Sequence, residues 1–263
     1  NPSMSVSPTK GIFKCFSCGK SGTALSFLME HEHLSYPEAL KYLAAKYGIE
    51  VQEEEESPEQ IAQRLKYESL AIVSQYAGEY YQDYLFNSEH GKAIGLAYFK
   101  ERGFSELTIK KFGLGFSPIG RSTFVDAAKA KSYKEDIIVD AGLAIRRDNG
   151  EVVDRFYDRV MFPIHNISGK IIAFGGRTLR TDKSVAKYIN SPETELYNKS
   201  RSLYGIFFAK SAISKEDKCY LVEGYTDVLS MHQAGIENVV ASSGTALTVE
   251  QIRLIKRFTN KIT

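Results

Sequence analysis

The stretch Lys218-Cys-Tyr-Leu-Val-Glu-Gly-Tyr-Thr-Asp227 predicts a buried strand that ends at a carboxylate and is followed by a helix. Residues 219–222 form a short apolar run, residues 226–234 are typical of a helix that ends at Gly235, and residues 238–242 predict a second strand. In an open parallel sheet, ligands bind at the carboxyl ends of the strands, which is where Glu223 falls. The pattern predicts an α/β unit with Glu223 at its functional edge. A glutamate that simply begins a helix, near the favourable end of the helix dipole, fits the same spacing.

Composition places the chain among globular proteins. Its 263 residues are 43% hydrophobic and 25% charged, enough for one large or two to three small domains. No apolar run reaches the ~18 residues of a membrane span, and three cysteines indicate a reducing compartment rather than a disulfide scaffold. The chain opens on Asn1 without a signal peptide, so we expect a piece of a longer protein.

Charge is unevenly distributed along the chain, although the net charge is only +2. Residues 143–215 carry 13 Lys/Arg against 7 Asp/Glu, which gives +6, whereas residues 1–57 carry 5 against 8, which gives −3. A basic middle segment fits a nucleic-acid surface, and solvated cations on an ordinary surface have the same composition.

Near the N-terminus, two short strands are predicted to meet at a turn and to lead into a Cys-x-x-Cys-Gly knuckle, in the run Val6-Ser-Pro-Thr-Lys-Gly-Ile-Phe-Lys-Cys-Phe-Ser-Cys-Gly19. Cys15 and Cys18 can point their sulfurs at one metal, and Gly19 permits the bend that aims amide N–H groups at a thiolate. A structural zinc site needs four ligands, and His31 and His33 on the following predicted helix are poorly placed to complete it. The pattern favours half of a zinc site over a redox pair or plain structural thiols.

Helices are predicted on both sides of an acidic linker. Before it, helices are expected at residues 23–31 and 36–48, the second with a capping box that starts at Ser35. Residues 53–56 are all glutamate and precede Ser57-Pro58, which predicts a domain boundary near residues 52–58. After it, a long tyrosine-rich helix is expected, followed by shorter ones and a turn-rich segment without a phosphate-loop signature: residues 60–86, 91–102, 105–112, 122–131 and 134–141, with the turns at 113–120.

The hydrophobic period then changes to two. Residues 143–147 and 151–157 predict a hairpin around a two-residue Asn-Gly turn, and residues 159–165 and 170–175 predict a second pair of strands. Gly175 and Gly176 leave little side-chain bulk, which would let a backbone or a phosphate come close. Five cations lie on or beside these elements: Arg155, Arg159, Arg177, Lys187 and Lys199. They could hold a nucleoside triphosphate or a strand backbone, and scattered surface charge is equally consistent with their spacing.

Taken together, eight runs resemble the bacterial replicative primases of the DnaG type. They occur in the family's order over nearly the whole chain, and several are long enough to be specific. The runs are Lys14-Cys-Phe-Ser-Cys-Gly-Lys-Ser-Gly22, Phe27-Leu-Met-Glu-His31, Asp154-Arg-Phe-Tyr-Asp-Arg-Val-Met-Phe-Pro-Ile164, Ile172-Ala-Phe-Gly-Gly-Arg177, Lys187-Tyr-Ile-Asn-Ser-Pro-Glu-Thr194, Leu203-Tyr-Gly205, Val222-Glu-Gly-Tyr-Thr-Asp227 and Ala241-Ser-Ser-Gly-Thr-Ala246.

The resemblance implies a mixed α+β and α/β architecture in three parts. Residues 1–52 would be part of a zinc-ribbon module that engages template, and residues 53–58 a linker. Residues 59–215 would form the basic α+β subdomain of an RNA polymerase core, and residues 216–263 the start of a Toprim α/β domain. Such enzymes join ribonucleoside triphosphates into short RNA primers on single-stranded DNA. They work in the bacterial cytoplasm at the replication fork, beside a replicative helicase bound through a C-terminal region.

The resemblance also implies roles for particular residues. Glu223 would be the Toprim glutamate that organises a catalytic Mg²⁺ or Mn²⁺ ion, and Cys15 and Cys18 would be half of a zinc site. The nucleotide and template groove would be lined by Arg155, Arg159, Arg177, Lys187, Tyr188 and Asn190, and Lys199 and Arg102 would touch nucleic acid. This agrees with the chemistry, since phosphoryl transfer to a 3′-hydroxyl needs a metal and cations on the triphosphate.

Two departures from the family pattern bear on activity. The family's upstream Cys and His ligands would precede Asn1, so we expect this chain to bind zinc weakly or not at all. Two further acidic Toprim motifs would follow Thr263, so we expect these 263 residues to be catalytically inactive by themselves. The alternatives are a Toprim nuclease or topoisomerase, which shares the strand-Glu-Gly signature, and a non-catalytic single-stranded DNA-binding module.

Overall fold

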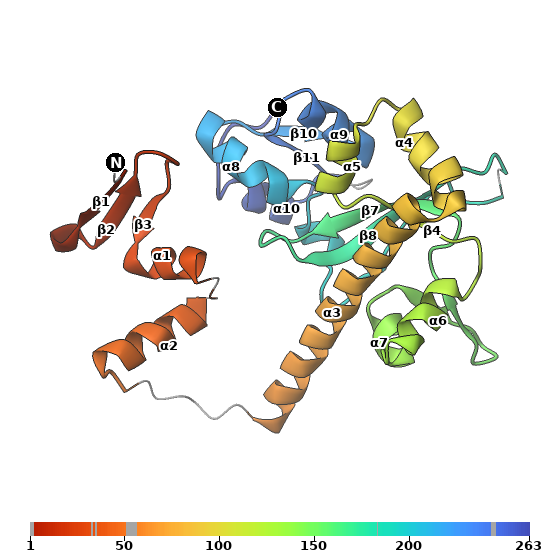
Figure 1. Cartoon of the computed structure of the whole chain (residues 1–263), viewed down its shortest axis with the longest axis horizontal. Coiled ribbons are helices and arrows are strands. Elements are labelled where there is room, and N and C mark those ends of the chain that lie inside the picture. The colour runs from red at the N-terminus through yellow and green to blue at the C-terminus, as the bar shows by residue number, and fades with distance from the viewer. Residues whose placement is uncertain (1–2, 33, 35, 51–56, 183, 243–245) are drawn as a thin grey trace. The chain divides into compact units, whose positions relative to one another are not determined.

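The computed structural model describes residues 3–32, 34, 36–50, 57–182, 184–242 and 246–263. The chain divides into two compact units, Asn1–Ser57 and Pro58–Thr263 (Figure 1). None of the helices in the described ranges is both long and apolar enough to cross a membrane. Residues 51–56 of the predicted linker lie outside the described residues, and the finer boundaries at 52/53, 58/59 and 215/216 stay predictions.

The first unit is a small sheet with two helices. Strands β1 (Met4–Ser7) and β2 (Ile12–Cys15) pair antiparallel around a 3₁₀ turn, Pro8–Lys10, that closes at Gly11 with φ 63°. Strand β3 (Ser21–Thr23), which the sequence did not predict, pairs with the other edge of β2. Helices α1 (Ala24–His31) and α2 (Tyr36–Tyr47) follow as expected, and Ser35 of the predicted capping box lies outside the described residues. Only Ala39 and Ala44 are buried among this unit's described residues.

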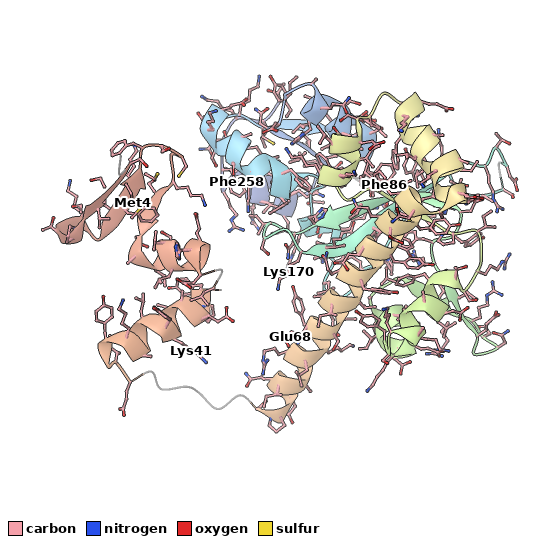
Figure 2. The ribbon with its side chains drawn as sticks, viewed as in Figure 1. Met4, Lys41, Glu68, Phe86, Lys170 and Phe258 are labelled. Carbon is pink, nitrogen blue, oxygen red and sulfur yellow. The ribbon has the colours of Figure 1, made fainter. Side chains whose placement is uncertain are left out.

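The second unit is built on one long helix against an antiparallel sheet. Helix α3 (Pro58–Asn87) contacts strands β4 (Gly115–Ser117) and β8 (Ile171–Thr178) of a sheet whose order is β4-β7-β8-β9, with β7 at Arg159–His165 and β9 at Tyr188–Asn190. Figure 2 shows Glu68 on the first half of α3, where most side chains are exposed, and Phe86 near its end. Beyond Leu70 one face of α3 is buried, and Tyr81 is 1% exposed, so this tyrosine belongs to the core.

Short helices and a hairpin complete this layer: a π-helix at Gly91–Leu96, α4 (Ala97–Glu101), α5 (Glu106–Lys111), α6 (Thr123–Ala130), α7 (Glu135–Asp140), β5 (Ala144–Arg146) and β6 (Val152–Asp154). Two expectations were wrong in detail. The segment predicted as turns at 113–120 contains β4, which is fully buried. The turn between β5 and β6 has three residues, 148–150, and not two, because Arg147 N donates to Glu151 O and the loop closes at Gly150 with φ 83°.

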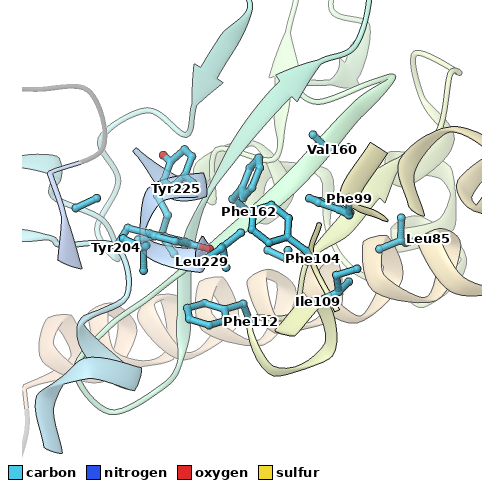
Figure 3. Close-up of a cluster of buried hydrophobic side chains, with 14 of the residues drawn as sticks. Leu85, Phe99, Phe104, Ile109, Phe112, Val160, Phe162, Tyr204, Tyr225 and Leu229 are labelled. Atoms are coloured by element: carbon cyan, nitrogen blue, oxygen red, sulfur yellow. The ribbon is translucent and has the colours of Figure 1, made fainter. Parts of the chain in front are cut away.

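The last part is an α/β arrangement. Strands β10 (Tyr220–Val222) and β11 (Val239–Ala241) are parallel and are joined by helix α9 (Tyr225–Gln233), as predicted. Ile262 pairs in parallel with Cys219 on the other side of β10, and helices α8 (Ile206–Glu216) and α10 (Val249–Ile255) complete this part. Figure 3 shows Tyr225 and Leu229 of α9 in one buried cluster with Phe162 of β7. A shared core therefore joins this part to the antiparallel sheet, and the mixed α+β and α/β fold class is confirmed.

Candidate functional site

Glu223 lies in a cavity with other residues that the sequence singled out. The carboxylate is exposed directly after β10, and Gly224 N donates to Asp227 Oδ2 at 3.0 Å to begin α9. A cavity of about 630 Å³ is lined by Tyr188, Asn190, Ser191, Lys199, Glu223, Gly224, Tyr225 and Asp227. The fold thus brings four predicted site residues together from β9, the 3₁₀ turn Lys199–Arg201 and the β10–α9 junction.

Tyr225, which the sequence did not single out as a site residue, fixes the geometry of this cavity. Its hydroxyl donates to Asn190 Oδ1 at 2.8 Å, and its ring stacks on Phe162 with centroids 5.0 Å apart. A Cβ on Gly175 would lie 2.4 Å from the Tyr225 ring, so the glycine is needed for this packing. Because they have no Cβ, Gly175 and Gly176 leave room for neighbouring side chains, where the sequence had suggested room for a backbone or a phosphate.

Arg155 and Arg159 are bonded to backbone carbonyls. Arg155 donates from Nε and Nη2 to Asn190 O at 3.2 and 3.0 Å. Arg159 is 6% exposed, and its Nη1 donates to three carbonyls: Gly176 O at 3.3 Å, Ala186 O at 3.0 Å and Lys187 O at 3.4 Å. Burial lowers the pKa of both guanidinium groups. Both arginines thus donate hydrogen bonds to β9 or to the residues just before it. Direct contact of either arginine with a phosphate stays a prediction.

A second cavity of about 740 Å³ contains Arg177, Lys187 and Tyr98 among its lining residues. Arg177 donates to the Tyr98 hydroxyl, its Cζ lies 4.7 Å from the Tyr98 ring centroid, and Arg102 Cζ lies 5.4 Å from the same centroid. Arg177 Cζ is also 5.7 Å from the Tyr188 ring of the first cavity. Arg177 therefore connects the two cavities, and Lys187 is exposed beside it.

Tyr98 was not predicted to be a site residue. It lies 79 residues before Arg177 in the chain, and a lone tyrosine in a helix carries no signal of a distant partner. Burial is the main reason that its pKa is raised. The nearby guanidinium groups of Arg177 and Arg102 are a favourable setting for an aromatic ring, since cations are attracted to its face.

In the first unit, Cys15 and Cys18 form the predicted knuckle. Gly19 has φ 76° and donates to Cys15 O at 2.9 Å, and Ser3 Oγ lies 3.6 Å from Cys15 Sγ. A hydrogen bond from the Cys18 backbone, followed by the one from Ser3, lowers the pKa of the Cys15 thiol to about 7. This donor set fits two of the four ligands of a tetrahedral zinc ion.

The described residues contain no group of three or more His, Cys, Asp or Glu side chains that could hold a metal ion. Cys15 and Cys18 thus stand without further ligands of these types among the described residues, and their role as zinc ligands stays a prediction. At the other candidate site, the Glu223 and Asp227 carboxylates are both exposed. Asp227 accepts the bond from Gly224 N, whereas Glu223 has no hydrogen bond or ion pair with the described residues. Glu223 fits one ligand position of a divalent cation, not a complete coordination shell.

Three family models match successive parts of the chain. The CHC2 zinc finger matches residues 1–59, the N-terminal domain of the DNA primase catalytic core matches residues 80–210, and the Toprim-like domain matches residues 220–263.

Similar proteins agree with this division. The chain is 42% identical to the DNA primase of Listeria monocytogenes, over 99% of this chain and 42% of that protein. It is 41% identical to the DNA primase of Clostridium acetobutylicum, again over 99% of this chain and 42% of that protein. The chain thus spans about two-fifths of the length of the curated relatives it matches.

Among solved structures, the Aquifex aeolicus primase (zinc binding and RNA polymerase domains) is 35% identical, with a TM-score of 0.69, over 100% of this chain and 61% of that chain. A DnaG primase catalytic domain bound to ssDNA is also 35% identical, with a TM-score of 0.69, over 76% of this chain and 63% of that chain. The zinc-ribbon, catalytic-core and Toprim-like matches, in this order and with these relatives, show that the chain belongs to the DnaG-type family of DNA primases.

Proposed function

We propose that the protein carrying this chain is a DNA primase, a nucleotidyltransferase that joins ribonucleoside triphosphates into short RNA primers on single-stranded DNA. The observation that carries the proposal is the cavity in which Glu223 and Lys199 lie with Tyr188 and Asn190. Phosphoryl transfer needs a carboxylate for a divalent cation and a cation for the phosphate groups, and this cavity offers both.

Glu223 would supply one oxygen ligand to Mg²⁺ or Mn²⁺. When bound, such an ion activates the attacking 3′-hydroxyl and neutralises charge on the phosphates. Lys199 would offset the remaining negative charge, and Lys187, at the second cavity, would contact the phosphate backbone of the template. Tyr188 is 41% exposed at the cavity, so its ring is available for stacking on a base.

Arg177 and Arg102, which both lie close to the Tyr98 ring, would contact the phosphate backbone of the template. Two positions proposed from the sequence as groove residues, Arg155 and Arg159, would act through the carbonyls that they bind, by holding β9 in place. The relative bound to ssDNA supports a single-stranded DNA template for this chain.

The knuckle of Cys15 and Cys18 would provide two ligands of a structural zinc ion in a module that engages template. The match to the CHC2 zinc finger supports this role. Ribonucleoside triphosphates and an RNA product follow from the activity. A replicative helicase partner and a place at the replication fork in the bacterial cytoplasm are part of the same proposal.

Incorporation of labelled ribonucleotides on single-stranded DNA tests the proposal. The protein that carries this sequence is expected to make short RNA products that require a divalent cation. Degradation of the template would instead identify a Toprim nuclease, and tight binding without incorporation would identify a single-stranded DNA-binding module. For residues 1–263 alone we expect template binding without incorporation, since Glu223 has no carboxylate cluster around it in the described residues.

A further inference from the structure

Gln251, in the first turn of α10, is a fully buried polar side chain at 0% exposure. Its Nε2 donates to Ser202 O at 2.8 Å and to Lys199 O at 3.2 Å, and its Oε1 accepts from Thr248 N at 3.2 Å. Both N–H groups of the amide therefore have carbonyl partners and its oxygen has an N–H partner. This arrangement determines which way the amide faces.

The backbone that Gln251 holds is the 3₁₀ turn Lys199–Arg201. Thr248 adds a third bond from the same helix end, from its Oγ1 to Ser200 O at 2.5 Å. From the opposite direction, Glu193 Oε1 accepts from Lys199 N at 2.9 Å. The peptide groups on both sides of the Lys199 Cα are thus fixed, the N–H by Glu193 and the carbonyl by Gln251.

Lys199 lines the same cavity as Glu223. A lysine side chain has several rotatable bonds, so its ammonium is placed reproducibly only if its backbone is fixed. We propose that Gln251 is a positioning residue, which holds the Lys199 turn so that the lysine cation meets phosphate groups beside Glu223. This inference rests on the proposed function, because it assigns Lys199 a phosphate partner.

The buried position of Gln251 means that it acts through Lys199 rather than by touching a nucleotide. A purely structural role is the competing explanation, since the same bonds also attach α10 to the fold. The two differ in one respect. A positioning effect disappears once the lysine cation is removed, whereas a loss of stability does not.

The experiment is a double-mutant cycle with Gln251→Met, which keeps the length but removes both donors, and Lys199→Gln, which removes the cation. In the protein that carries this sequence, two constants are measured: the KM for ribonucleotides and the Kd for a labelled (dT)16 strand. A change in the KM for ribonucleotides would identify the triphosphate as the partner of Lys199, and a change in the Kd for (dT)16 would identify a template phosphate. Each single variant is expected to raise the same constant by about three- to tenfold, and the double variant by no more than Lys199→Gln alone.

Thermal unfolding of each variant supplies the control, together with Ile255→Val. Ile255 lies in the same helix, is fully buried against Leu203 and its neighbours, and belongs to the apolar cluster rather than to the turn. We expect Ile255→Val to lower the Tm without changing either constant. If Gln251→Met does not fold, Thr248→Ala takes its place in the cycle with the same expectation.

Two results would overturn the inference and leave the proposed function standing. In the first, the fold-changes of the two single variants multiply in the double variant. In the second, Gln251→Met leaves both the KM and the Kd unchanged although Lys199→Gln raises one of them. If Lys199→Gln changes neither constant while RNA synthesis is retained, the role of Lys199 and the inference both fail. An absence of RNA synthesis in the unmodified protein would refute the proposed function itself.

Discussion

The salt dependence of DNA binding should separate cations that meet phosphate from cations that hold the backbone. Lys187 is exposed at the second cavity, whereas the Arg155 guanidinium donates twice to Asn190 O. Lys187→Gln and Arg155→Gln each remove one positive charge. We expect only Lys187→Gln to remove a phosphate contact.

The magnitude follows from counterion release. Each phosphate contact on single-stranded DNA contributes about 0.7 to the slope of log K against log [salt], and therefore about fivefold in affinity at 0.1 M salt relative to 1 M. Lys187→Gln should reduce the slope by about 0.7. Arg155→Gln should leave the slope unchanged and lower the free energy of unfolding by about 1–3 kcal/mol, because Asn190 O loses a charged donor in a half-buried setting.

Fluorescence anisotropy of labelled (dT)16 between 50 and 200 mM salt, with a thermal melt of each variant, provides the measurement. Lys215→Gln, an exposed lysine at the end of α8, is the matched control and should leave the slope unchanged. A slope that falls for Arg155→Gln and not for Lys187→Gln would contradict these two assignments.

Two further predictions concern pH and packing. Burial lowers the pKa of His165 from 6.5 to about 4. Between these values the unfolded chain binds a proton that the folded chain does not, so this contribution to stability is present above pH 6.5 and is lost as the pH falls toward 4. Relative to His165→Leu, the wild type should lose about 2 kcal/mol of unfolding free energy between pH 8 and pH 5, measured by denaturant titration. Gly175→Ala should destabilise the fold by about 1–3 kcal/mol in a thermal melt, because its Cβ would meet the Tyr225 ring at 2.4 Å.

An equal pH dependence in wild type and His165→Leu would contradict the first of these predictions. A Gly175→Ala protein with unchanged Tm would contradict the second. A matched check for the second is Ala173→Gly on the same strand, which should destabilise through backbone entropy without displacing Tyr225.

Local patterns were sufficient for the elements around Glu223. An apolar run, a glutamate, a glycine and a helix-period segment predict β10, α9 and the position of Glu223 at a strand end, because each of these signals depends on neighbours in sequence. The same holds for the Cys15 and Cys18 knuckle, whose turn needs only Gly19. Strand β9 was missed because three residues between polar segments show no period.

Contacts between distant residues could not be predicted in this way. Spacing does not distinguish a guanidinium on a phosphate from one on a carbonyl, so it left the partner of Arg159 open. The resemblance placed Arg159 in the groove, and the structure shows that it donates to three carbonyls. Tyr98 and Gln251 have partners 79 and 52 residues away, respectively. Only the folded structure brings these residues to their partners.

The most direct test of the central claim is Glu223→Gln in the protein that carries this sequence. The amide keeps the size of the side chain and removes the charge that a divalent cation requires. We predict a loss of ribonucleotide incorporation of about 100-fold or more, with (dT)16 affinity unchanged or slightly tighter. Glu216→Gln, which changes an exposed carboxylate of α8, should keep normal activity. Incorporation by Glu223→Gln at the rate of the unmodified protein would contradict the central claim.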